Sequence, residues 1–291
     1  MRMSHRRRHA SLAASFVTLC TAVGLTAAAV PAQAGAGLDY VALGDSFSAG
    51  SGVWPPDFDA PSACSRSTAN YPNLVADTIG ANLTDVTCGG AQTTDLYESQ
   101  SAGVPPQLDA LTAETDLVTL TIGGNDNNTF VGALLRCVAA GTITGGSGDP
   151  CRDVYGGYFE RQVQQTTYPR LRQALLDIQA RAPQAQVAIL GYPWILPPEN
   201  GCFSSMPVAR GDVPYLRSLQ ATLNDAIRRA AAETGAMYVD FTQVSEGHDA
   251  CQPRGTRWIE PLIYGTQLVP VHPNRLGYQQ MAAHTVATLG L

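Results

Sequence analysis

The sequence predicts an α/β fold in which helices cover both faces of a parallel sheet. Short apolar runs alternate along the chain with longer segments whose apolar residues recur at helical spacing, which is typical of such folds. The 291 residues are 45% apolar and 14% charged, a composition that excludes a disordered polyelectrolyte. No repeat, charge block or low-complexity linker divides the chain, so we expect residues 35–291 to form one domain.

Five short apolar runs are the predicted strands. Residues 38–43 lead into a turn that contains glycine, and residues 116–122 form the clearest strand of the set. The other three predicted strands are residues 82–87, 186–190 and 236–241.

The predicted helices lie between and after these strands. Residues 71–79 carry apolar side chains at helical spacing, and residues 159–182 are amphipathic and stop before Pro183. Residues 216–234 form a further helix, and residues 276–289 form the helix that closes the chain.

Two sections, residues 132–157 and 191–214, are rich in Gly and Pro and carry cysteines. We interpret them as disulfide-tied insertions above the sheet. In folds of this class ligands bind beyond the carboxyl ends of the strands, so functional residues are expected there.

The first 34 residues have the organisation of a secretory signal peptide. Four arginines within the first eight residues precede an uncharged apolar run over residues 12–30, and Ala32-Gln33-Ala34 forms a small-x-small cleavage pattern. A transmembrane anchor is the alternative, but the run is rich in Ala and Thr and ends at Pro31. We therefore expect cleavage after Ala34, secretion, and no stable membrane anchor.

The charge balance excludes some classes of partner. All 18 basic residues are arginine, and removal of residues 1–34 leaves 14 of them against 24 acidic residues, a net charge of −10. Nucleic acid and anionic membranes repel such a chain electrostatically, so we expect no nucleic-acid partner. We expect the secreted protein to be a monomer.

Cysteine usage agrees with export. Cys20 lies in the predicted signal peptide, and six cysteines remain, an even number that is typical of disulfides in a secreted chain. A zinc site is the alternative, but no pair has C-x-x-C spacing. Six cysteines allow 15 pairings. We expect the sequential one: Cys64 with Cys88, Cys137 with Cys151, and Cys202 with Cys251.

Polar residues and glycines follow three of the predicted strands. The first strand runs into Gly44-Asp45-Ser46, the second is followed by Gly89-Gly90, and the third by Gly123-Gly124-Asn125-Asp126. His272 stands just before the last predicted helix. A serine hydroxyl needs a base such as imidazole, and glycine lets backbone N–H groups approach a developing oxyanion closely. These motifs therefore predict a site with a hydroxyl nucleophile.

Each motif alone has an ordinary explanation. Ser46 could cap the helix that follows it, the glycine pairs could be turns, and His272 before a proline could be a surface histidine. We interpret Asp45 as an Asx-turn residue, because its neighbour would carry the reaction. The conjunction of all the motifs, in order and at strand ends, favours the catalytic interpretation.

Together the motifs resemble those of the GDSL or SGNH hydrolases, specifically the secreted actinobacterial, Streptomyces-type lipases and esterases. The resemblance extends from the first predicted strand to the last helix, and it implies a flavodoxin-like three-layer α/β/α fold with a five-stranded parallel sheet. It implies that Ser46 is the nucleophile and His272 the general base. It also implies an oxyanion hole formed by the side-chain amide of Asn125 and the backbone N–H groups of Gly90 and Ser46. The relatives carry three disulfides in sequential order, which supports the pairing expected above.

The sequence departs from the family pattern at one position. Many members have an acid three residues before the histidine, where this chain has Val269. We expect a main-chain carbonyl of Val269 or Pro270 to hold the Nδ1 hydrogen instead, as in some actinobacterial relatives. The candidates for an acid elsewhere in the chain are Asp249, Glu246 and Glu260.

The sequence therefore predicts a secreted serine esterase that hydrolyses carboxylic esters, with a small-molecule or lipid ester as its partner. The lipid preference follows from the resemblance, with slight support from the apolar segments at Trp54 and residues 192–198, which could equally be buried loop anchors. The alternatives are an acetylxylan-type carbohydrate deacetylase on the same site and a non-catalytic secreted binding protein.

No metal or cofactor is expected. The chain contains no G-x-S-x-G elbow, P-loop, Rossmann fingerprint or H-E-x-x-H motif. Its three histidines beyond the predicted signal peptide, His248, His272 and His284, have no metal-like spacing. We interpret His248, near Cys251, as structural, with a place at the mouth of the pocket as the alternative.

Overall fold

A computed structural model of the protein describes residues 37–291. The predicted signal peptide, its cleavage after Ala34 and Cys20 lie outside the described residues. Among the described residues, no helix has the length and apolar character needed to cross a membrane.

The centre of the fold is a sheet of five strands in the order β2-β1-β3-β4-β5, with every neighbouring pair parallel. This confirms the predicted sheet, although three strands end earlier than expected. The strands are β1 (Asp39–Gly44), β2 (Asn82–Asp85), β3 (Leu117–Thr121), β4 (Gln186–Leu190) and β5 (Met237–Val239).

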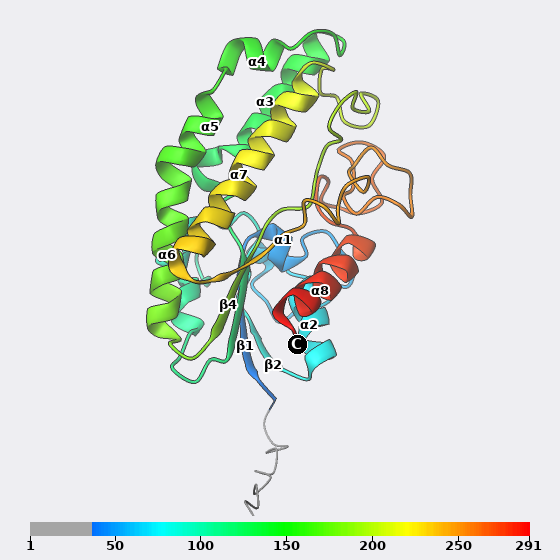
Figure 1. Cartoon of the computed structure of the whole chain (residues 1–291). Helices are drawn as coiled ribbons and strands as arrows, with labels where there is room; N and C mark the ends of the chain where they lie inside the picture. The colour runs from blue at the N-terminus through cyan, green and yellow to red at the C-terminus, as the bar shows by residue number, and fades with distance from the viewer. Residues whose placement is uncertain (1–36) are drawn as a thin grey trace, which may run out of the picture. The chain divides into compact units, whose positions relative to one another are not determined.

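Helices cover both faces of the sheet (Figure 1). Alternate residues of β1 point to opposite faces: Tyr40 and Ala42 belong to one buried apolar cluster, and Val41 and Leu43 belong to the other. The first face is covered by α2 (Tyr71–Ile79) and α8 (Arg275–Leu289), and the second by α6 (Tyr168–Arg181) and α7 (Asp212–Thr234). The predicted three-layer α/β/α architecture is therefore confirmed.

The segment predicted as one helix over residues 159–182 consists of three parts. These are α5 (Tyr158–Gln162), a π-helical turn (Val163–Thr167) and α6. Pro169 has no N–H to donate to the carbonyl of residue 165, so an α-helical bond cannot form at this point and the turn widens. The segment ends at Ala182, directly before Pro183, as expected.

The section 132–157, interpreted as a disulfide-tied insertion, is largely helical. It contains α3 (Phe130–Ile143) and α4 (Pro150–Tyr155), which stand above the sheet in Figure 1 and are joined by the Cys137–Cys151 disulfide. Helix α7 also begins four residues before the predicted start. The carboxylate of its first residue, Asp212, accepts hydrogen bonds of 2.9 Å from the backbone N–H groups of Cys151 and Arg152 and so holds the start of α4.

All three disulfides have the sequential pairing expected from the sequence, Cys64–Cys88, Cys137–Cys151 and Cys202–Cys251. The remaining regular elements are short. They are α1 (Ser46–Ala49) and 3₁₀ turns at Ser62–Cys64, Thr93–Leu96, Gln107–Ala110 and Asp126–Asn128.

Candidate active site

Ser46 begins α1 at the carboxyl end of the inner strand β1. The carboxylate of Asp45 caps this short helix by accepting a 3.0 Å hydrogen bond from the Phe47 N–H. Asp45 is therefore the turn residue that the sequence analysis expected. Gly44 has φ +120°, and a Cβ at this position would lie 2.3 Å from the Thr121 carbonyl oxygen, so no side chain fits there. The local sequence thus fixes the position of the hydroxyl.

His272 meets Ser46 across 226 positions of sequence. The Nε2 atom of His272 lies 2.7 Å from Ser46 Oγ, and Nδ1 lies 2.8 Å from the Pro270 carbonyl oxygen. Because a carbonyl can only accept, Nδ1 carries the hydrogen, and Nε2 is left free to accept from the serine hydroxyl. Of the two carbonyls considered from the sequence, it is that of Pro270 which contacts Nδ1.

The loop that carries His272 is held in a strained conformation. Val271 has φ +59°, which is unfavourable for a β-branched residue. Two backbone hydrogen bonds of 2.9 Å with Glu260 offset the strain of this conformation. The Val271 N–H donates to the Glu260 carbonyl, and the Glu260 N–H donates to the His272 carbonyl. Asn274 then caps α8 by accepting from the Gly277 N–H at 3.0 Å. The backbone therefore presents the imidazole at a defined place.

Burial lowers the pKa of His272, and the hydrogen bond to the Pro270 carbonyl opposes this in part. The Phe47 ring packs beside the imidazole, with 5.2 Å between the ring centroids. The imidazole is therefore neutral at neutral pH and can accept a proton.

The three carboxylates considered as a third catalytic group have other partners in the described structure. Glu260 binds Arg257 through two hydrogen bonds, at 3.2 and 2.6 Å, and Glu246 pairs with Arg217. Asp249 accepts a 2.9 Å hydrogen bond from the Cys251 N–H. The described contacts of the imidazole nitrogens are those to Ser46 and Pro270.

A buried network, which the sequence analysis did not predict, joins the ends of three strands. Asp45 accepts from the Tyr192 hydroxyl at 2.5 Å and from the Thr121 hydroxyl at 2.8 Å. The Tyr192 hydroxyl accepts in turn from the Gly124 N–H at 3.0 Å. Burial raises the pKa of Asp45 to about 6, and the hydrogen bonds from Tyr192 and Thr121, which lower the pKa, only partly oppose this rise. The network therefore connects the Ser46 turn to the loop that carries Asn125.

The signal that could have identified Tyr192 was its position two residues beyond β4, at the same edge of the sheet as the recognised motifs. Residues 192–196 are buried, and two of them, Tyr192 and Ile195, also line the cavity described next, so the segment is both a loop anchor and part of the site. Trp54 is 69% exposed. His248 stacks on Trp258, with 4.7 Å between the ring centroids, and is not among the residues that line the cavity described next.

One cavity of about 360 Å³ contains all four predicted catalytic positions, Ser46, Gly90, Asn125 and His272. Gly90 has φ +78°. The Gln100 side chain holds the adjacent Gly89 by donating to its carbonyl at 2.8 Å. The side-chain amide of Asn125 donates to the Ala91 carbonyl at 3.0 Å. The rest of the wall is mainly apolar and includes Phe130, Leu134, Ile195, Leu223 and Leu262.

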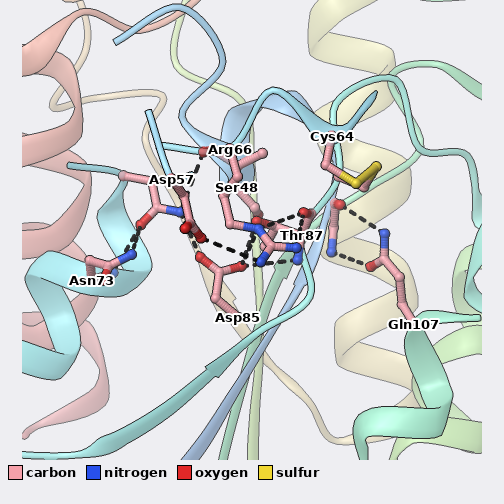
Figure 2. A network of polar contacts seen from close by, with 12 residues as sticks. Ser48, Asp57, Cys64, Arg66, Asn73, Asp85, Thr87 and Gln107 are labelled. Carbon is pink, nitrogen blue, oxygen red and sulfur yellow. Dashed lines mark hydrogen bonds and ion pairs between the residues drawn. A yellow bond between two sulfur atoms is a disulfide. The ribbon is translucent and has the colours of Figure 1, made fainter. Parts of the chain in front are cut away.

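Polar contacts beneath this edge of the sheet keep the strand ends in place (Figure 2). Gln107 binds both backbone groups of Gly44, accepting from its N–H at 2.6 Å and donating to its carbonyl at 3.0 Å. Arg66 donates two hydrogen bonds to the Thr87 carbonyl and pairs with Asp85 at 3.4 Å. These contacts hold the ends of β1 and β2 in place.

A hydroxyl and a neutral imidazole lie in contact at the carboxyl edge of a parallel α/β sheet, inside a largely apolar cavity, an arrangement that can support hydrolytic chemistry. The sequence matches the GDSL-like lipase/acylhydrolase family over residues 42–280, and the chain belongs to this family. It is an ester hydrolase of the lipase and esterase class.

Similar proteins agree with this assignment. The chain is 62% identical over 275 residues to Lipase 2 of Streptomyces coelicolor, with 93% of each chain covered. Phospholipase A1 from Streptomyces albidoflavus has a similar solved structure, with a TM-score of 0.74, 28% identity and coverage of 87% of this chain and 100% of that one. The extracellular lipase of Streptomyces rimosus gives a TM-score of 0.70 at 27% identity and covers 86% and 99% of the two chains.

Proposed function

We propose that Ser46 is the nucleophile and His272 the general base of a reaction that proceeds through an acyl-enzyme. The observation that carries this proposal is the 2.7 Å contact between Ser46 Oγ and His272 Nε2. As Ser46 attacks the ester carbonyl, Nε2 takes the hydroxyl proton and then gives it to the departing alcohol. In the second half of the reaction His272 activates the water that releases the acid.

The Pro270 carbonyl is proposed as the group that orients His272. Its 2.8 Å contact with Nδ1 selects the tautomer in which Nε2 is the acceptor. A carbonyl dipole stabilises the imidazolium less than a carboxylate does, because it carries no net charge. We therefore infer a catalytic dyad rather than a triad.

We assign the stabilisation of the oxyanion to three hydrogen-bond donors, which are the backbone N–H groups of Ser46 and Gly90 and the side-chain amide of Asn125. Support comes from their place on the wall of the same cavity. Donors fixed before the reaction stabilise the charge that develops on the carbonyl oxygen without reorganising at that moment.

A lipid acyl ester is the proposed substrate class, because the wall of the catalytic cavity is mainly apolar. A series of p-nitrophenyl esters from acetate to decanoate tests this assignment. Activity that persists on the longer chains supports a lipid substrate. Activity confined to acetate would instead support a carbohydrate deacetylase on the same site.

We also infer secretion, with residues 1–34 as the signal peptide. Three disulfides support this inference, since such bridges persist in oxidising compartments. N-terminal sequencing of the protein recovered from the culture medium tests it, and a start at Gly35 is the expected result.

The direct test of the catalytic proposal is Ser46→Ala with p-nitrophenyl butyrate as substrate. Loss of essentially all turnover is expected, with the melting temperature close to that of the parent protein. Ser204→Ala is a matched control, because Ser204 is exposed and does not line the cavity around Ser46. Full activity of Ser46→Ala would refute the proposal.

A further inference from the structure

Asp126 has a buried carboxylate to which the reaction proposed above gives no role. It directly follows Asn125 in the chain and is fully buried. Both of its carboxylate oxygens accept a hydrogen bond of 2.8 Å from one residue, Thr93: Oδ1 from the backbone N–H and Oδ2 from the side-chain hydroxyl. Thr93 is buried as well, and it lies three residues beyond Gly90. The Asp126–Thr93 contact therefore joins the loop of Asn125 to the loop of Gly90.

The sheet itself does not join these two loops. Gly90 follows β2 and Asn125 follows β3, and β1 lies between those strands in the order β2-β1-β3. Ladder hydrogen bonds join only neighbouring strands and stop where the strands end. The distance between the Gly90 N–H and the Asn125 amide therefore depends on contacts between the loops.

Four hydrogen bonds in the described structure supply these contacts. Two of them belong to the Asp126–Thr93 contact. The third runs from the side-chain amide of Asn125 to the Ala91 carbonyl at 3.0 Å, and the fourth, also at 3.0 Å, is donated by the exposed residue Asn127 to a glutamine side chain. Hydrogen bonds away from water are electrostatically stronger, so we expect the Asp126–Thr93 contact to hold the loops most firmly.

The bond to Ala91 determines which way the Asn125 amide faces. Because a carbonyl can only accept, the amide atom beside the Ala91 carbonyl is the nitrogen. One of its two hydrogens is used there, and the second has no partner among the described residues. Asn125 lines the cavity around Ser46, so this second hydrogen is available to an oxyanion. A shift of the Asn125 loop away from Ala91 would misplace it.

The loop of Gly90 also has supports of its own. The N–H of Gly89 donates to the Cys64 carbonyl at 2.8 Å. A disulfide joins Cys64 to the cysteine that precedes Gly89. Loss of the contact to Asp126 should therefore displace the Asn125 amide rather than the Gly90 N–H.

We propose that Asp126 and Thr93 are positioning residues for the oxyanion donor of Asn125. Their contact keeps the Asn125 amide against the Ala91 carbonyl, at a fixed distance from the Gly90 N–H. The negative charge of Asp126 cannot itself stabilise an oxyanion, so its part in the reaction is the pair of hydrogen bonds that it accepts. A donor that is already in place stabilises the transition state without reorganisation. This proposal rests on the function proposed above.

The experiment is a double-mutant cycle between Thr93→Val and Asn125→Ala, with p-nitrophenyl butyrate as substrate. Thr93→Val removes the hydroxyl and preserves the branched shape of the side chain, whereas Thr93→Ser keeps the hydroxyl. Thr93→Ala is a second deletion variant, which leaves room for water beside Asp126 and takes the place of Thr93→Val if that variant does not fold.

Thr115→Val is the matched control. Thr115 is buried, and its hydroxyl accepts one hydrogen bond of 3.1 Å from the Thr112 N–H. It precedes the amino end of β3, so it lies at the opposite end of this strand from Asn125. The control thus loses a buried hydroxyl far from the proposed oxyanion donors.

We expect Thr93→Val to lower kcat by about tenfold and to change KM by less than about twofold, because the displaced donor is partly lost in the transition state. Thr93→Ser should recover most of this loss. In the Asn125→Ala background, Thr93→Val should lower kcat by less than about twofold, because the donor that Thr93 positions is already absent. Thr115→Val should leave kcat within about twofold of the parent value.

An alkyl trifluoromethyl ketone provides a second measurement. Ser46 Oγ bonds to the ketone carbon, the serine proton passes to His272, and the ketone oxygen becomes an oxyanion, so the adduct resembles the tetrahedral intermediate. Its inhibition constant should rise about tenfold in Thr93→Val, in parallel with the loss in kcat, and should stay unchanged in Thr115→Val.

Two results would overturn the proposal. One is an equal loss of kcat from Thr93→Val with and without the Asn125 side chain, and the other is a loss no larger than that of Thr115→Val. Failure of the proposed function is seen separately, in variants that leave Thr93 intact. It would appear as turnover by Ser46→Ala or as the parent kcat in Asn125→Ala.

Discussion

Removal of the Tyr192 hydroxyl tests the hydrogen-bond network that holds the Ser46 turn. The substitution Tyr192→Phe removes one oxygen atom and preserves the shape of a side chain that is only 5% exposed. That oxygen donates to Asp45 at 2.5 Å and accepts from the Gly124 N–H at 3.0 Å. The variant therefore leaves a buried carboxylate oxygen and a buried N–H group without their partners.

The expected loss follows from these two contacts. A hydrogen bond to a charged group contributes roughly 1.5–3 kcal/mol, and a buried N–H left unpaired costs a further amount of about 1 kcal/mol or more. The free energy of unfolding should therefore fall by about 3 kcal/mol at pH 8, where Asp45 is ionised. The loss should be nearer 2 kcal/mol at pH 5, where Asp45 is largely protonated in the folded protein, because the lost bond is then between neutral groups while the Gly124 N–H is still left unpaired.

The direction of this pH dependence is set by Asp45. Its pKa is about 6 in the folded protein against an ordinary value of 3.8, so its contribution to stability decreases as the pH rises from about 4 to 6. The Tyr192 hydrogen bond opposes the rise in pKa. Without that bond the folded-state pKa increases further, and the decrease in stability continues to higher pH. The difference between parent and variant must then widen from pH 5 to pH 8.

Urea denaturation followed by circular dichroism at the two pH values measures this difference. Tyr155→Phe is the matched control, because the Tyr155 hydroxyl makes no hydrogen bond in the described structure, and it should change stability by less than about 0.5 kcal/mol. A loss in Tyr192→Phe that is equal at pH 5 and pH 8, or no larger than that of the control, would refute the reasoning.

Three further predictions concern the base, the oxyanion hole and the covalent framework. Burial lowers the pKa of His272 and the proposed mechanism needs its neutral form, so kcat/KM should rise with pH through a midpoint below 6.5, and a midpoint above 6.5 would contradict this. Asn125→Ala should lower kcat by about 10²–10³-fold with little change in KM, whereas a drop of less than about fivefold would remove Asn125 from the oxyanion hole. The Cys202–Cys251 bridge spans 49 positions and so restricts a long loop of the unfolded chain. Replacement of both cysteines by serine should lower the free energy of unfolding by about 4 kcal/mol in a urea titration, and an unchanged midpoint would argue against this stabilisation through loop closure.

Elements with strong local signals were predictable from the sequence. Helix α2 occupies residues 71–79 as expected, because Asn70 caps its start through a 3.0 Å bond to the Asn73 N–H and Gly80 ends it in the left-handed conformation. The motifs after β1, β2 and β3 were recognisable for a related reason. Parallel strands bring their carboxyl ends to one edge, so polar residues at those positions converge.

Features that depend on contacts between distant segments were not predictable. The Asp45–Tyr192 bond joins residues 147 positions apart, and no local pattern indicates that the tyrosine hydroxyl points back to the first strand. The strained φ of Val271 is tolerated because Glu260 holds the loop from the other side, a pairing that appears only in three dimensions. The helices within residues 130–155 were not predicted, because the glycines of this segment give it a weak helix propensity. Tertiary packing of α3 overrides that weak propensity.

The central claim is that Ser46 is made nucleophilic by His272, and covalent labelling tests it most directly. The protein is treated with a fluorophosphonate probe, digested and analysed by mass spectrometry, in parallel with a His272→Ala variant. The account predicts one probe adduct per chain, located on Ser46, and a labelling rate reduced by several orders of magnitude in the variant. Labelling of another residue, or an equal rate without the imidazole, would contradict it.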